Sequence, residues 1–134
     1  MTTETIFATF RYANDELGKF INAVKEDVSL KDNIFIAATG DHNMRGIGYS
    51  DYPEELVFGH EVPFYLYMPE KYIRNTAVRY DPKRLGSHKD IITTLVSHAV
   101  SDYTFYSFGC DMLSNDKCNF PYAYNQSVSV GYGK

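Results

Sequence analysis

The chain has few of the features that would place it across a membrane or on nucleic acid. No apolar stretch approaches the roughly 20 residues that a transmembrane helix needs. The 13 lysine and arginine residues are scattered, and the formal net charge is −4, which disfavours binding to a phosphate backbone. Residues 1–5 lack the basic and apolar segments of a signal peptide. We therefore expect no nucleic-acid partner and no targeting signal within this chain.

Cysteine is also scarce, with only Cys110 and Cys118 separated by seven residues. Zinc sites usually begin with two to four residues between paired cysteines, so this spacing fits no zinc motif. The two cysteines form either a short-loop disulfide in an oxidising compartment or a pair of free thiols. The spacing alone does not choose between these states.

Length and composition indicate one soluble globular unit. The 134 residues suffice for one domain with a core, and the chain is 44% hydrophobic and 22% charged. No internal repeat is visible. Apolar spacing predicts a helix over 14–27, and Ser87 with Asp90 predicts a second helix that starts with a variant of the capping box. Strands are predicted over 33–39 and 63–68 and near 128–130, with long irregular connections over 40–62 and 69–87.

Residues 33–42 are the most informative stretch. Ile34 to Ala38 are apolar without a break, which is typical of a strand covered on both faces in a parallel sheet. Ligands of such α/β sheets bind beyond the carboxyl ends of the strands. Asp41 and His42 follow this strand directly. A carboxylate beside an imidazole suits a divalent metal ion. We predict an α/β fold in which Asp41 and His42 either form a metal site or are a turn residue after Gly40 and its neighbour.

Three of the four histidines lie just outside the predicted elements. His42 follows the first strand, His60 precedes the second, and His88 starts the second helix. Elements of this kind can meet at one crevice, although each histidine alone would more commonly be structural. His98 lies within the second helix, where we expect a packed or surface residue without a functional role.

The segment from Asn33 to Gly46, Asn-Ile-Phe-Ile-Ala-Ala-Thr-Gly-Asp-His-Asn-Met-Arg-Gly, resembles the sulfatase-like branch of the alkaline phosphatase superfamily. There a hydrophobic strand runs into Thr-Gly-Asp-His or Ser-Asp-His-Gly. The similarity covers about residues 12–113. It includes the helix 12–21, the run His-Glu-Val-Pro-Phe-Tyr-Leu-Tyr at 60–67, and a Phe-Gly and Met-Leu pair at 108–109 and 112–113.

The strongest further match is Gly86-Ser-His-Lys-Asp-Ile-Ile-Thr-Thr-Leu95, which is similar to the family's Gly-Ser-His-x-Asp-Ile-x-Pro-Thr-Leu signature. Thr93 stands where the family usually has proline. The nearest likeness is to the lipoteichoic-acid-synthase-like phosphoglycerol transferases. The resemblance implies a small, mostly parallel sheet flanked by helices, as in the C-terminal part of an alkaline-phosphatase-like sandwich.

The resemblance also implies metal-dependent displacement at a phosphate or sulfate ester. Asp41 and His42 would bind a divalent metal ion, either Mn, Mg, Ca or Zn. His60 and His88 would contact the substrate or a second metal ion. The family's nucleophile and its first metal-binding acid come from an earlier half of the domain, and residues 1–11 offer no counterpart. We therefore expect residues 1–134 to be one partial domain, inactive alone.

The intact parent would act on a lipid-linked phosphoglycerol or a similar ester of the cell envelope, on the periplasmic or extracellular side of the inner membrane. One alternative is a non-catalytic module that binds an anion or a partner on the same scaffold. The other is an unrelated α/β domain with a coincidental Gly-Asp-His. Faces left uncovered by the missing half would favour a homodimer, and the following residues are the ones expected to be exposed: Phe20, Phe35, Phe64, Leu66, Tyr103, Phe105, Tyr106 and Phe108.

Overall fold

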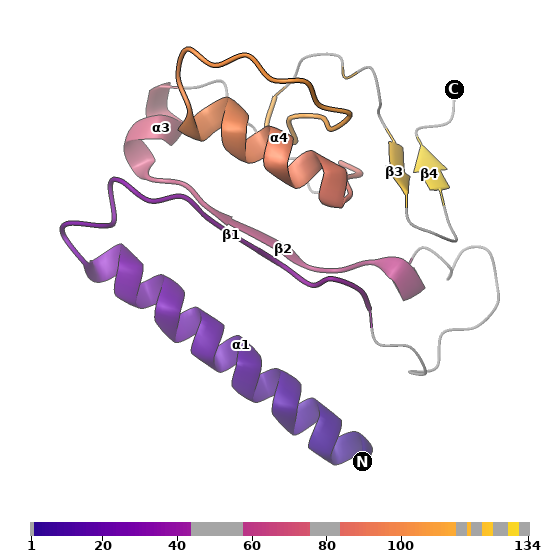
Figure 1. Ribbon diagram of the computed structural model, residues 1–134. Helices are drawn as coiled ribbons and strands as arrows, with labels where there is room; N and C mark the ends of the chain where they lie inside the picture. Colours follow the sequence, from indigo (N-terminus) through magenta and orange to yellow (C-terminus); the bar gives the residue numbers. More distant parts are fainter. Residues whose placement is uncertain are drawn as a thin grey trace.

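A computed structural model describes residues 2–43, 58–75, 84–114, 118, 122–124 and 129–131. Its elements are α1 (Thr3–Glu26), β1 (Ile36–Thr39), β2 (Phe64–Tyr67), α3 (Glu70–Asn75), α4 (His88–Ala99), β3 (Tyr122–Tyr124) and β4 (Ser129–Gly131). Figure 1 shows α1 and α4 on opposite sides of the β1–β2 pair, with β3 and β4 beside the first turns of α4. The described part is thus a mixed α and β structure in which helices flank a small sheet.

Helix α1 begins much earlier than the predicted start near residue 14. Thr2 caps it, because its hydroxyl oxygen accepts a hydrogen bond from the backbone N–H of Thr5 at 3.3 Å. Asn14 and Asp15 are residue types that commonly cap a helix, and they stand where the predicted helix would begin, but they lie inside α1. The helical spacing extends back through Ile6, Phe10 and Ala13, so the apolar stripe is continuous from the first turns to Val24.

The end of α1 is fixed by Asp27. Its Oδ1 atom accepts hydrogen bonds from the hydroxyl of Ser29 at 2.6 Å and from the backbone N–H of Ser29 at 2.7 Å. These bonds favour the charged carboxylate and hold the pKa of Asp27 below its usual value of 3.8. The chain then turns toward β1, where the Tyr67 hydroxyl donates to the carbonyl of Lys31 at 2.7 Å.

The sheet differs from the predicted parallel arrangement. Strands β1 and β2 pair antiparallel, with Ile36 opposite Tyr67 and Thr39 opposite Phe64. Strands β3 and β4 form a second antiparallel pair. In each pair the start of the second strand lies beside the end of the first, whereas parallel strands would start side by side. The apolar run of β1 arises instead because helices lie on both sides of an antiparallel pair (Figure 1).

Two further expectations need correction. Residues 36–38 of β1 are half-buried and Thr39 is exposed, so the strand is less covered than predicted. Residues 70–75, predicted to be irregular, form α3 directly after the buried Pro69, and proline readily precedes a helix. The second strand and the helix that follows Ser87 are confirmed. The predicted strand near 128–130 is β4, and β3 was not foreseen.

The apolar core of the described residues is small. Val24 and Met68 are its buried hydrophobic residues. The buried polar residues lie in the first two turns of α4: Asp90, Thr93 and Thr94. Within the described helices, none is long and apolar enough to cross a bilayer.

Candidate metal centre

The end of β1 carries the residues that the sequence singled out. Because β1 and β2 are antiparallel, the carboxyl end of β1 lies beside the amino end of β2. A side chain at Gly40 would touch Val62, which shows how closely the two segments approach. The Asn43 amide also donates to the carbonyl of Phe58 at 3.2 Å. Residues 40–43 and 58–63 therefore form one surface at this end of the sheet.

Asp41 and His42 lie side by side on that surface. The Nε2 atom of His42 is 3.5 Å from Oδ2 of Asp41, and both side chains are largely exposed. The other carboxylate oxygen, Oδ1, accepts the backbone N–H of His42 at 2.9 Å, which orients the carboxylate. The pair is open to solvent and therefore accessible to an ion.

The hydrogen bonding of His42 fixes which ring nitrogen is free. Its Nδ1 atom lies 2.8 Å from the carbonyl oxygen of Asn43. A carbonyl can only accept, so Nδ1 must carry the proton. In the neutral imidazole Nε2 then holds a lone pair, and this atom is the one near the carboxylate of Asp41. A histidine held through its other nitrogen is the usual arrangement of a metal ligand.

His88 reaches the same end of β1 from the first position of α4. Its Nε2 atom lies 2.8 Å from the carbonyl oxygen of Gly40, the residue before Asp41. By the same reasoning Nε2 donates, which leaves Nδ1 of the neutral ring as an acceptor. The structure thus brings His88 to the neighbourhood of Asp41 and His42, although its contact is to the backbone.

His60 precedes β2 and is exposed on the segment that faces residues 40–43. A hollow lined by Asn43, Phe58, Glu61, Val62 and Pro63 adjoins this segment. Among the described residues, no group of three or more histidine, cysteine, aspartate or glutamate side chains is arranged to hold a metal ion. Residues 44–57, which include most of the long loop after His42, lie outside the described part.

The fourth histidine has a structural partner. Nε2 of His98 lies 2.9 Å from Oδ2 of Asp111, and both side chains are mostly buried. The backbone carbonyl of Asp111 also accepts a hydrogen bond from Arg84 at 3.1 Å. These contacts hold the segment after α4 against the helix, so His98 is a packed helix residue, one of the two roles expected for it.

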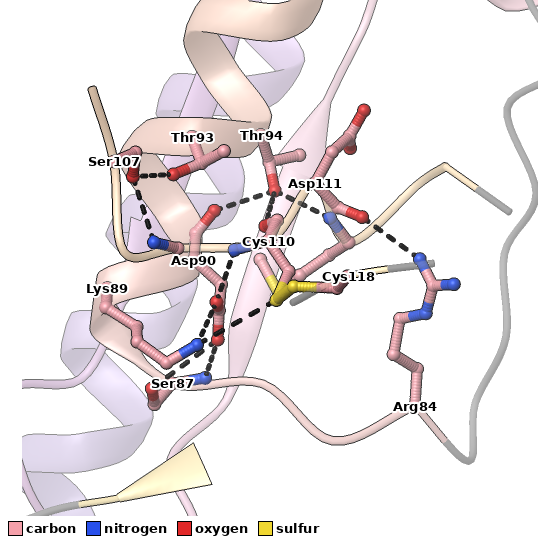
Figure 2. The surroundings of a disulfide bond; sticks show 12 residues. Arg84, Ser87, Lys89, Asp90, Thr93, Thr94, Ser107, Cys110, Asp111 and Cys118 are labelled. Carbon is pink, nitrogen blue, oxygen red and sulfur yellow. Dashed lines mark hydrogen bonds and ion pairs between the residues drawn. A yellow bond between two sulfur atoms is a disulfide. The ribbon is translucent and has the colours of Figure 1, made fainter. Parts of the chain in front are cut away.

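A second polar cluster lies at the start of α4 and was only partly foreseen (Figure 2). The capping box was predicted, and Asp90 Oδ2 does accept the backbone N–H of Ser87 at 2.7 Å. Oδ1 of the same carboxylate accepts from Lys89 Nζ at 2.6 Å and from the backbone N–H of Cys110 at 2.7 Å. The sequence gives no signal for this last bond, because it joins residues 20 positions apart.

The cysteines, left open by their spacing, form the disulfide Cys110–Cys118 in this structure. Thr94 supports the segment around Cys110, because its hydroxyl donates to the carbonyl of Asp90 at 2.7 Å and accepts the backbone N–H of Met112 at 2.9 Å. The segment after α4 is thus held against the helix by the hydroxyl of Thr94 and by the buried carboxylate of Asp90 (Figure 2). Comparison of the chain with protein-family models, curated proteins and solved structures found no match.

Proposed function

We propose that the chain is the C-terminal portion of a sulfatase-like, metal-dependent enzyme that acts on phosphate or sulfate esters of the cell envelope. The observation that carries the proposal is the pair of acceptors at Asp41 Oδ2 and His42 Nε2, 3.5 Å apart and open to solvent. A hard carboxylate oxygen and an imidazole nitrogen suit Mn²⁺, Zn²⁺ or Mg²⁺. Such an ion would supply Lewis-acid stabilisation of charge on the ester.

The roles of the chain's own residues follow from their contacts. Asp41 would hold the ion with a carboxylate that the backbone N–H of His42 already orients. His42 would bind through Nε2 while Nδ1 stays bonded to Asn43. His88, anchored at Gly40, and His60 would contact the ester or a second ion from the flanks.

The nucleophile and the remaining metal ligands would come from the other half of the parent domain, and the antiparallel β1–β2 pair would form part of its larger sheet. The parent would face an oxidising compartment, outside the cytoplasmic membrane. The Cys110–Cys118 disulfide supports this location, because such bonds persist in oxidising compartments. A lipid-linked phosphoglycerol is the substrate class that the sequence resemblance favours.

Calorimetric titration with Mn²⁺ or Zn²⁺ tests the metal site on this chain. We expect binding far weaker than that of closed structural zinc sites, which release about 10–16 kcal/mol, because only part of the ligand shell is present. Binding should weaken further at acid pH, because a protonated His42 cannot bind a metal ion. Asp41→Ala should abolish the heat of binding, and Asp32→Ala, an exposed acid in the preceding turn, should leave it unchanged.

Binding that survives Asp41→Ala would place the ion elsewhere and refute the proposed site. Failure of both ions to bind the wild-type chain would favour the alternative, a non-catalytic module on the same scaffold.

A further inference from the structure

The surroundings of the disulfide contain a charged group that a purely structural bond would not require. Nζ of Lys89 lies 4.0 Å from Sγ of Cys110 and 2.6 Å from Oδ1 of Asp90. The side chains of Lys89 and Asp90 are 9% and 3% exposed. Keeping an ammonium group out of water is costly unless it is paired. Figure 2 shows the ammonium group directed at both the carboxylate and the sulfur.

Asp90 is one of several partners of the Lys89 ammonium group. The carboxylate of Asp90 accepts three strong hydrogen bonds, from Lys89 and from the backbone N–H groups of Ser87 and Cys110. The ammonium group has three N–H donors. Its Nζ atom lies 4.0 Å from the Cys110 sulfur and 5.1 Å from the centre of the Tyr122 ring. Lys89 can therefore donate to negative charge that develops on Cys110.

We propose that Cys110–Cys118 is a site of thiol–disulfide exchange with small dithiols and that Lys89 assists the departure of the Cys110 sulfur. The rate of exchange rises when the leaving thiolate is stabilised, and a nearby lysine stabilises a thiolate. Attack is therefore directed to Sγ of Cys118. The proposal stands apart from the metal site and would hold if that site were absent.

The exchange proceeds in two displacements. One thiolate of the dithiol attacks Sγ of Cys118, a new S–S bond forms, and the Cys110–Cys118 bond breaks with its electron pair left on Cys110. The second thiolate of the reagent then attacks the reagent sulfur that is bonded to Cys118. The reagent is released as a cyclic disulfide, and the Cys118 thiolate that leaves takes up a proton. The reagent loses two electrons and the protein gains two.

The rate of reduction by dithiothreitol, followed by trapping of free thiols, tests the role of Lys89. Lys89→Gln should slow the reduction of the disulfide in the folded protein by about threefold or more. Lys89→Arg should keep most of the wild-type rate, because it keeps the charge. Lys19→Gln removes the same charge from an exposed site on α1 and should have no effect. In concentrated guanidinium chloride the variants should react equally.

Loss of structure cannot imitate this result, because an unfolded Lys89→Gln variant would expose the disulfide and react faster. A rate equal to or faster than wild type would overturn the proposal. Acid-quenched reaction with glutathione gives a second readout by peptide mass spectrometry. Glutathione should be found on Cys118 in the wild type, and its presence on Cys110 or an equal division between the two would also overturn the proposal.

Discussion

At the scale of single residues, the buried carboxylate of Asp90 accepts hydrogen bonds from three different residues. It is 2% exposed, and it joins the cap of α4, the ammonium group of Lys89 and the backbone of Cys110. A carboxylate with this many donors ties a helix to a segment 20 residues away. The start of α4, and with it the position of His88, depends on these bonds.

Replacing Asp90 by Ala should lower the free energy of unfolding by about 3–5 kcal/mol, because the ammonium group of Lys89 would stay buried without its carboxylate. Chemical denaturation measures the change. Asp32→Ala removes an exposed acid and should lie within about 0.5 kcal/mol of wild type. Equal stability of the two variants would mean that the carboxylate makes no net contribution.

The residues of the candidate site could be selected from the sequence, whereas their contacts could not. Asp41 and His42 stand out because an apolar strand runs directly into them, and the capping box at Ser87 and Asp90 follows from local spacing. The bond between His88 and Gly40 joins residues 48 positions apart. Such pairs depend on tertiary packing, for which one sequence holds no local pattern.

At the scale of elements, the segment after α4 lies so close to the helix that only glycine fits at position 109. A Cβ atom there would run into the backbone carbonyl of Lys89 and the hydroxyl of Thr93. The hydroxyl of Ser107 also contacts Thr93, and it accepts the backbone N–H of Gly109 at 2.9 Å. The approach of these two segments is what places Cys110 beside Lys89.

Gly109→Ala should therefore destabilise the protein by about 1–3 kcal/mol through overpacking. Gly18→Ala is the matched control, because a Cβ atom on Gly18 of α1 would meet nothing within 4 Å. That substitution should stabilise the protein by up to about 1 kcal/mol, since alanine favours a helix interior over glycine. Urea denaturation of both variants measures the difference, and changes of the same sign would contradict the packing described here.

The sequence predicted the elements whose positions depend on local residue spacing. It did not predict features that depend on tertiary packing, such as the direction in which strands pair. The strand 64–67 and the helix after Ser87 were located from their own residues. The parallel sheet was not found in the described residues, because an apolar run reports coverage by helices and not the direction of the neighbouring strand. The predicted helix begins too late because Asn14 and Asp15 are typical capping residues, whereas Thr2 provides the cap of α1.

At the scale of the whole molecule, the described part leaves many large apolar side chains in contact with solvent. Of the residues predicted to be uncovered, Phe20, Tyr103, Tyr106 and Phe108 are exposed. The others, Phe35, Phe64, Leu66 and Phe105, are half-buried. Along α1 the apolar stripe is buried at Val24, whereas Phe7 and Phe10 are about half exposed. Within the described residues, β1 and β2 also pair only with each other.

We predict that the isolated chain forms homodimers, because uncovered apolar faces and unpaired strand edges favour self-association. Sedimentation over a range of concentrations should show a monomer–dimer equilibrium. Phe10→Asp, on the apolar stripe, should shift it toward monomer. Tyr12 lies on the opposite side of α1 and is more exposed than Phe10, so Tyr12→Asp should have little effect. A compact monomer at all concentrations, without dye binding, would refute the prediction.

The most direct test of the proposed metal site is paramagnetic broadening by Mn²⁺ in NMR spectra of the folded chain. Bound at Asp41 and His42, the ion should first broaden the ring signals of His42 and the backbone amides of residues 40–43. The ring of His88 should broaden next, because its contact with Gly40 keeps it near the ion. Signals of Glu16 and Lys19, an exposed acid and base on α1, should broaden only at much higher concentration. Broadening that begins elsewhere, or that persists unchanged in Asp41→Ala, would contradict a metal site at the end of β1.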